Sequence, residues 1–163
     1  MIDCKISKLP VKLSDICHHY NIAIIKNSNI NENSNAKLTF TERGKSIFSD
    51  KQRYIIVKDT EPYPAQRFTI AHEIGHIIIP TFDEYEADRF SIGILAPACV
   101  LWGCNIHQIN DIMKMCCISE RAATIRSRRL ELLYQRNKFL SSPLEQQVFE
   151  QFSDFIKNNR HSE

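Results

Sequence analysis

Residues 67–79 read RFTIAHEIGHIII, and this stretch decides most of what the chain predicts about its fold. Within it, His72 and His76 stand four residues apart. In an α-helix that spacing puts both imidazoles on one face, about 40° apart at ~3.6 residues per turn. Glu73 follows about a quarter turn away. Because most of the other side chains are apolar, the stretch predicts a largely buried helix with a single polar stripe.

The polar stripe has the spacing of a metal centre. Two imidazoles on one helical face can hold one metal ion, and the carboxylate of Glu73 can accept a proton from a water that the metal activates. Thr69 lies in the same arc of the helical wheel as His72, His76 and Glu73. The alternative is a core helix with two hydrogen-bonded histidines and a solvated glutamate. We favour the metal centre because a polar stripe on so apolar a helix needs a polar partner.

A third ligand is expected after this helix, because hydrolytic zinc has three protein ligands and one open position. Glu84 and Glu86 are the candidates. On the wheel of a second predicted helix, Glu84 and Asp88 lie about 40° apart within an apolar arc, whereas Glu86 points away. We therefore favour Glu84 over Glu86 as the ligand, with Asp88 accepting a hydrogen bond from a ligating imidazole. Alternatively, Glu84 forms a capping box with Thr81.

Several stretches of the chain together resemble one known family. They read LP at 9–10, RFTIAHEIGH at 67–76, EYEADRF at 84–90, ILAP at 94–97 and CISERAA at 117–123. In this combination they resemble the ImmA/IrrE family of metallopeptidases, and the resemblance covers about residues 9–133. One departure is FSIGILAP at 90–97, where the family often has FAxxLLMP; it affects no expected ligand.

The resemblance implies a function and a role for each matching residue. His72, His76 and Glu84 are the implied ligands of one Zn²⁺ ion, and Glu73 is the implied catalytic base. Relatives are zinc peptidases of bacteria and their mobile elements that cleave or antagonise transcriptional repressors. We therefore expect a zinc-dependent endopeptidase whose protein partner is a DNA-binding repressor of a mobile element or stress response. The alternative is a zinc-containing regulator that binds a repressor or DNA without proteolysis.

Composition agrees with a soluble, cytoplasmic protein. The chain has 163 residues, of which 43% are hydrophobic and 25% charged. Its net charge of +2 is too small to predict direct nucleic-acid binding. No apolar run approaches the ~18 residues of a membrane span, and no signal-peptide core is present. The six cysteines form no paired C-x-x-C knuckles, so we expect reduced thiols, most of them in the core.

The predicted fold is α+β and zincin-like. We expect one domain over residues 1–163, with an N-terminal α/β part at 1–64 and a helical part at 65–163. Short strands are predicted at 22–25, 38–40, 46–48 and 54–57, with a mobile asparagine-rich loop at 27–35. We expect these strands to form a small antiparallel sheet packed on a helical bundle. The bundle includes the helix with the His-Glu-x-x-His (HExxH) motif at residues 72–76.

Two serines predict the starts of the C-terminal helices. Ser119 caps a helix from 120 to about 138, and Ser142 begins a last helix that runs towards Lys157. The first of these helices is rich in arginine, including Arg126, Arg128 and Arg129. It vaguely resembles the second helix of a helix-turn-helix, but we favour a solvated basic face because the total charge is small.

Overall fold

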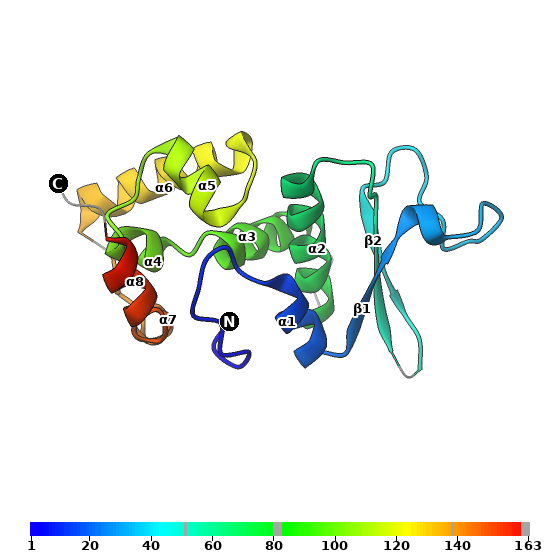
Figure 1. The fold of residues 1–163 in the computed structure, drawn as a ribbon, viewed down its shortest axis with the longest axis horizontal. Coiled ribbons are helices and arrows are strands. Elements are labelled where there is room, and N and C mark those ends of the chain that lie inside the picture. Colours follow the sequence, from blue (N-terminus) through cyan, green and yellow to red (C-terminus); the bar gives the residue numbers. More distant parts are fainter. Residues whose placement is uncertain (51, 80–82, 138, 161–163) are drawn as a thin grey trace. The chain divides into compact units, whose positions relative to one another are not determined.

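The computed structural model describes residues 1–50, 52–79, 83–137 and 139–160, and it has an α+β fold (Figure 1). The strands are β1 (Ile22–Lys26), β2 (Gly44–Phe48) and β3 (Arg53–Val57). The helices are α1 (Leu13–His19), the 3-10 helix η1 (Asn27–Asn29), α2 (Tyr63–Ile78), α3 (Glu84–Leu95), α4 (Ala98–Gly103), α5 (Ile109–Cys116), α6 (Glu120–Arg136), α7 (Pro143–Gln151) and α8 (Ser153–Asn159). The predicted α+β class is thus confirmed.

The sheet is mixed, so the prediction of an antiparallel sheet is wrong for one of its two pairs. Its strand order is β1-β3-β2, with β2 antiparallel to β3 and β1 parallel to β3. β1 ends at Lys26 and β2 begins at Gly44, and both residues pair with Val57 of β3. The segment between them therefore crosses one end of the sheet and leaves the place between β1 and β2 for β3, which runs parallel to β1 and antiparallel to β2. The strand predicted at 38–40 is also absent, and those residues are irregular.

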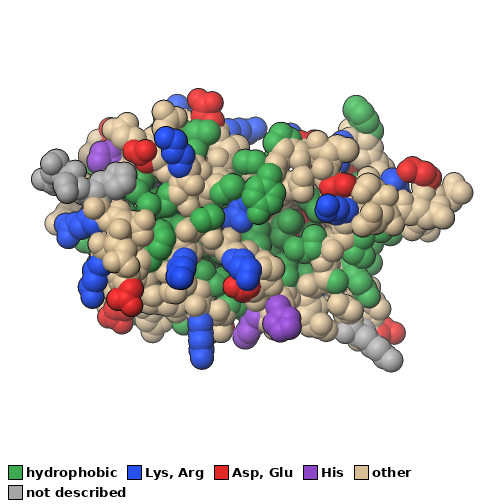
Figure 2. All heavy atoms as spheres, viewed as in Figure 1, with side chains coloured by type: hydrophobic (Ala, Val, Ile, Leu, Met, Phe, Trp, Pro, Cys, Tyr) green, Lys and Arg blue, Asp and Glu red, His purple; other side chains and the backbone are tan. Residues whose placement is uncertain are grey.

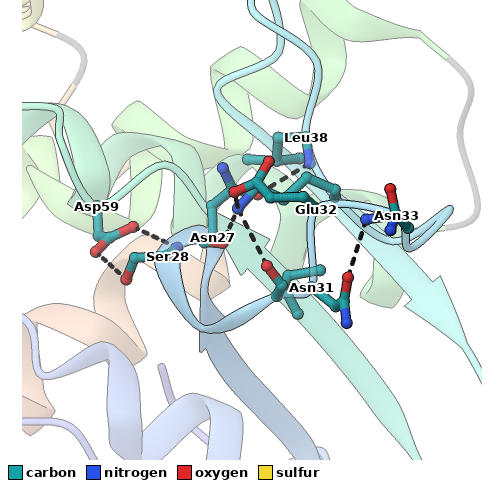
Figure 3. A network of polar contacts seen from close by, with 9 residues as sticks. Asn27, Ser28, Asn31, Glu32, Asn33, Leu38 and Asp59 are labelled. Carbon is teal, nitrogen blue, oxygen red and sulfur yellow. Dashed lines mark hydrogen bonds and ion pairs between the residues drawn. The ribbon is translucent and has the colours of Figure 1, made fainter.

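Side-chain hydrogen bonds order the asparagine-rich segment between β1 and β2 (Figure 3). The Lys37 ammonium donates to the carbonyls of Asn27 and Ile30 at 3.1 Å each, and it forms an ion pair with Glu32 at 2.7 Å. The Asn27 side chain accepts from the backbone N–H of Leu38 at 2.9 Å. The Leu38 N–H thus donates to a side chain of the same segment and not to a neighbouring strand. Residues 38–40, where a strand was predicted, form part of a loop.

The first of two compact units spans Leu13–Ser91 and contains the sheet. Helix α1 packs against β1, and α2 packs against β2 and β3 (Figure 1). Ile55 and Ile56 of β3 and Ile74 of α2 are fully buried. The sheet and α1 therefore support α2, the helix that carries the HExxH motif.

The second unit comprises Met1–Lys12 and Ile92–Glu163 and is built from helices. Within it, α5 packs on α6 and α4 packs on α7. The Gln151 side chain fastens the N-terminal segment by donating to the carbonyls of Ile6 at 2.5 Å and Met1 at 3.3 Å. The expectation that residues 1–163 form one domain divided at residue 64 stays a prediction.

The predicted starts of the C-terminal helices are confirmed, but one predicted helix is divided. Ser119 accepts a hydrogen bond from the Ala122 N–H at 3.3 Å, and Ser142 forms a capping box with Glu145. The helix after Ser142 ends at Gln151, and a separate helix follows the fully buried Phe152. Lys138, where the preceding helix was expected to end, lies outside the described residues.

One arginine of α6 is not on the surface. Arg126 is 8% exposed, and its guanidinium donates to the Ile92 carbonyl at 2.8 Å, while burial lowers its pKa to about 10. The expectation that Arg126 belongs to a solvated basic face is therefore wrong. The helical wheel explains the difference, because Arg126 lies on the same side as the buried Ala122, Ala123 and Leu130.

Several large apolar side chains reach the surface. Figure 2 shows such side chains between charged ones on the viewed face. Phe40 is the most exposed of them at 93%, and α6 contributes Ile125 and Leu132. Among the residues that the structure describes, no helix is long and apolar enough to cross a bilayer.

Candidate metal centre

Helix α2 brings the two predicted histidines together. Pro62 precedes its first residue and Pro64 is in its first turn, where the missing N–H of proline has no intrahelical partner to lose. The rings of His72 and His76 are 4.7 Å apart between centroids. Their Nε2 atoms lie 2.9 Å apart, so both nitrogens point at one position beside the helix.

Glu84 completes this cluster from the first turn of α3. Its two carboxylate oxygens lie 3.0 Å from His72 Nε2 and 3.4 Å from His76 Nε2. Ligands about 2.1 Å from a tetrahedral zinc ion stand about 3.4 Å from one another, so these spacings fit one ion. In the described part of the chain, His72, His76 and Glu84 are the only three such side chains whose donor atoms converge.

Asp88 holds the ring of His72. Its Oδ1 accepts a hydrogen bond from His72 Nδ1 at 2.9 Å, one helical turn beyond Glu84 on α3. With its proton on Nδ1, the imidazole presents the lone pair of Nε2 to the position shared with His76 and Glu84. This is the usual carboxylate–histidine–metal arrangement, in which the carboxylate fixes the tautomer and the ring orientation.

Glu86 is directed elsewhere. Its carboxylate accepts a hydrogen bond from Arg89 Nη1 at 3.1 Å, and Arg89 in turn lies over the ring of Tyr85. The structure thus places Glu84, and not Glu86, beside the two histidines. The alternative role of Glu84 is a capping box with Thr81, and Thr81 lies outside the described residues.

The expected burial of the two α3 carboxylates is wrong. The side chain of Glu84 is 77% exposed and that of Asp88 is 54% exposed, against 15% and 18% for the two imidazoles. The helical wheel placed Glu84 and Asp88 on one face of α3, and both carboxylates do lie against His72. That face borders a site open to solvent rather than the core.

The glycine of the HExxH motif lets α3 approach α2. A Cβ atom on Gly75 would lie 3.0 Å from Phe90 Cδ1 and 3.5 Å from the Ala87 backbone. Ala87 is buried and stands one helical turn from Glu84. A larger residue at position 75 would push α3 away and carry Glu84 and Asp88 with it.

Glu73, the residue after His72 on α2, is buried, with 8% of its surface exposed. Strand β2 begins beside it at Gly44, where a Cβ atom would overlap the Thr69 side chain and come within 3.7 Å of Glu73 Cγ. The sequence predicts a turn at Glu42-Arg43-Gly44, whereas Gly44 is the first residue of β2, and a glycine in a strand often marks a close approach of backbone. It is the residue that allows β2 to lie against α2.

The donor set fits zinc. Two imidazole nitrogens and one carboxylate oxygen form the set used by hydrolytic zinc centres, which keep a fourth position for water or substrate. Four of the six cysteines (Cys17, Cys99, Cys104 and Cys116) are buried. The prediction that most cysteines lie in the core is thus confirmed, and their reduced state stays a prediction.

A family model supports the same interpretation. Residues 17–99, about half of the chain, match the model of a peptidase family described as the IrrE N-terminal-like domain. The chain belongs to this family. The matched region contains His72, Glu73, His76 and Glu84, and the family assignment makes the protein a metallopeptidase. Searches of curated proteins and of solved structures found no match to the chain.

Proposed function

We propose that this metallopeptidase is a zinc-dependent endopeptidase that cuts a protein partner at one or a few sites. The observation that carries the proposal is the position of Glu73, a buried carboxylate next in sequence to His72 on α2, whereas the solvent-open Glu84 comes from α3. A site that only stabilises the fold closes the metal with four protein ligands. Here the described residues supply three ligands together with a base.

Each residue of the site has a distinct task. His72, His76 and Glu84 would hold the zinc ion, which would supply Lewis-acid polarisation of a carbonyl and lower the pKa of water. Glu73 accepts the proton as water attacks the scissile carbonyl and returns it to the leaving amine. Asp88 orients His72 through the 2.9 Å hydrogen bond and does not touch the substrate.

The edge of β2 is our candidate for binding the substrate backbone. In the order β1-β3-β2, one side of β2 is paired with β3, and no strand among the described residues pairs with the other side. An extended peptide can add to such an edge through backbone hydrogen bonds. Because Gly44 brings β2 close to Thr69 and Glu73, a peptide bound there would pass the proposed base.

We further propose that the substrate is a DNA-binding repressor of a mobile element or stress response. The motifs shared with the ImmA/IrrE family support this substrate class, because its members cleave or antagonise such repressors. Restricted cleavage also suits a regulator, since regulated proteolysis requires contacts beyond the scissile bond to select one protein. We therefore expect little hydrolysis of unfolded casein.

The competing proposal is a zinc-containing regulator that binds its partner without cutting it. One experiment separates the two. The parent protein, Glu73→Gln and Glu86→Gln are each incubated with the repressor encoded beside the gene, and fragments are identified by mass spectrometry. Glu86→Gln is the matched control, because it makes the same chemical change on a carboxylate that pairs with Arg89.

We expect specific fragments with the parent and with Glu86→Gln. Glu73→Gln should retain zinc and cleave at least ~100-fold more slowly, the usual contribution of a general base. Equal cleavage by Glu73→Gln would remove the proposed base. A stable complex without fragments for all three proteins would favour the non-cleaving regulator, and rapid digestion of casein would contradict a dedicated regulatory peptidase.

A further inference from the structure

Helix α6 has an exposed face on which arginine alternates with aliphatic side chains. At ~100° per residue, Arg121, Ile125, Arg128, Leu132 and Gln135 fall within about 80° of one another. Ile125 is 47% exposed and Leu132 is 42% exposed. Successive members are separated by four, three, four and three residues, which is the spacing of a coiled-coil seam. We call these five residues the α6 seam.

The opposite face of α6 already has its packing partners. Ala122, Ala123 and Leu130 are buried there, and the helix packs against α5 and α4. The α6 seam is therefore not needed for the packing of this helical unit. Its two aliphatic side chains stay nearly half exposed to solvent, and covering them with a partner would remove this apolar surface from water.

The basic residues along the α6 seam lack acidic partners. Arg121 and Arg128 lie in the seam and Arg129 and Arg136 flank it, and none forms an ion pair with any residue that the structure describes. By contrast, the exposed Arg89 on α3 pairs with Glu86. The α6 face thus combines four unpaired positive charges with two exposed aliphatic side chains.

We propose that the α6 seam docks an acidic amphipathic helix of a partner protein. Ile125 and Leu132 are seven residues apart, about 10.5 Å along the axis, so they match apolar side chains repeated every seven residues on a facing helix. Arg121 and Arg128 alternate with them and match glutamates or aspartates at the other seam position. This surface is additional to the proposed peptidase, and it does not require that the docked protein be the one that is cut.

The composition of the α6 seam favours a protein over nucleic acid. Phosphate contacts need basic or polar groups and leave exposed aliphatic side chains unburied, whereas protein interfaces combine apolar residues with arginine. The small net charge of +2 points the same way. A second copy of this chain is also disfavoured, because two such seams would bring arginine against arginine.

Binding to designed helices tests the proposal without requiring hydrolysis. The probe is a fluorescent helical peptide of about three heptads with Leu at one seam position and Glu at the other. A second peptide has Lys in place of Glu, and a DNA duplex of similar length is the third probe. Binding is measured by fluorescence anisotropy to the Glu73→Gln protein, so that the result is independent of cleavage.

We expect the acidic peptide to bind and the lysine peptide not to bind. Arg121→Glu/Arg128→Glu should weaken the acidic peptide at least ~10-fold and gain affinity for the lysine peptide, because the charge pattern is exchanged. Ile125→Ser/Leu132→Ser should also weaken the acidic peptide. The control Lys8→Glu/Arg160→Glu makes the same change in net charge at exposed positions of the same unit and should change the affinity less than twofold.

Three results would overturn the proposal. The first is no binding of the acidic peptide, or equal binding by Arg121→Glu/Arg128→Glu, provided that this variant has the circular dichroism spectrum of the parent. The second is a preference for the DNA duplex with an affinity that falls steeply with salt, which would assign the arginines to phosphate contacts. The third is a dimer in sedimentation that Ile125→Ser/Leu132→Ser disrupts, which would assign the face to a second copy.

Discussion

Glu84 and Glu86 stand two residues apart in one exposed helical turn, yet only Glu84 lies beside the histidines. Glu84→Gln removes a charged ligand and should weaken zinc binding much more than Glu86→Gln, which only breaks an exposed ion pair. Competition with a chromogenic chelator measures both affinities. The reverse ranking would move the ligand role to Glu86 and contradict the geometry of α3.

Asp88 acts through His72, so its substitution has a smaller expected effect. Asp88→Asn keeps the size of the side chain but offers a neutral acceptor, and we expect zinc affinity to fall about 10–100-fold. The same chelator competition measures this variant. If Asp88→Asn loses as much affinity as His72→Ala, then Asp88 is a ligand, and the assignment of the 2.9 Å contact as an orienting hydrogen bond is wrong.

Ser28 and Asp59 give a pH-dependent test of the loop shown in Figure 3. Hydrogen bonds from the Ser28 hydroxyl at 2.7 Å and its N–H at 3.0 Å hold the pKa of Asp59 below its ordinary value. The stabilisation is therefore present above the ordinary pKa and is lost as pH falls through the lowered one. Ser28→Ala should raise the pKa of Asp59 in an NMR titration.

The same titration contains its own control. The pKa of Glu42 is lowered by hydrogen bonds from Thr39 and not by Ser28, so Ser28→Ala should leave it unchanged. An unchanged pKa for Asp59 would show that the hydrogen bonds to Ser28 are not formed in solution. A parallel shift of Glu42 would indicate that the whole loop had rearranged.

The contact between β2 and α2 depends on the absence of a side chain at Gly44. Gly44→Ala introduces a Cβ atom that overlaps Thr69 Cγ2 and lies 3.0 Å from the Ile56 carbonyl, so we expect about 1–3 kcal/mol of destabilisation from overpacking. Thr69→Ser removes Cγ2 and should recover part of this loss in the double variant. Urea unfolding measures both effects.

Gly93→Ala is the matched control for Gly44→Ala, because it makes the same substitution at a glycine with free space around it. Gly93 lies within α3, and a Cβ atom there would meet nothing within 4 Å. Gly93→Ala should therefore stabilise the protein by up to about 1 kcal/mol, the difference in helix propensity. Gly44→Ala with parental stability, or no recovery with Thr69→Ser, would contradict the close approach of β2.

Local periodicity predicted the metal-binding helices better than the sheet. The four-residue spacing of His72 and His76 lies within one helix, and the relation of Glu84 to Asp88 lies within another, so neither depends on distant packing. Strand direction is different, because alternating side chains do not reveal which strand is the neighbour or how it runs. The parallel pairing of β1 with β3 and the role of Gly44 arise only from tertiary contacts.

Burial of the cysteines has a consequence for the whole molecule. Burial raises the pKa of Cys17, Cys99 and Cys104 to about 11, so few of these thiols are ionised at neutral pH. Iodoacetamide should therefore modify the partly exposed Cys4 and Cys117 first in the native protein, and all six cysteines only after unfolding. Mass spectrometry counts the adducts, and rapid modification of six thiols in native protein would contradict the packing.

X-ray absorption at the zinc edge tests the central claim most directly, because it identifies the atoms bound to the metal. We predict one zinc per chain with only nitrogen and oxygen ligands at about 2.0–2.2 Å, including two imidazoles, and loss of the metal in His76→Ala. Sulfur at about 2.3 Å would place zinc on the cysteines and contradict a centre formed by His72, His76 and Glu84.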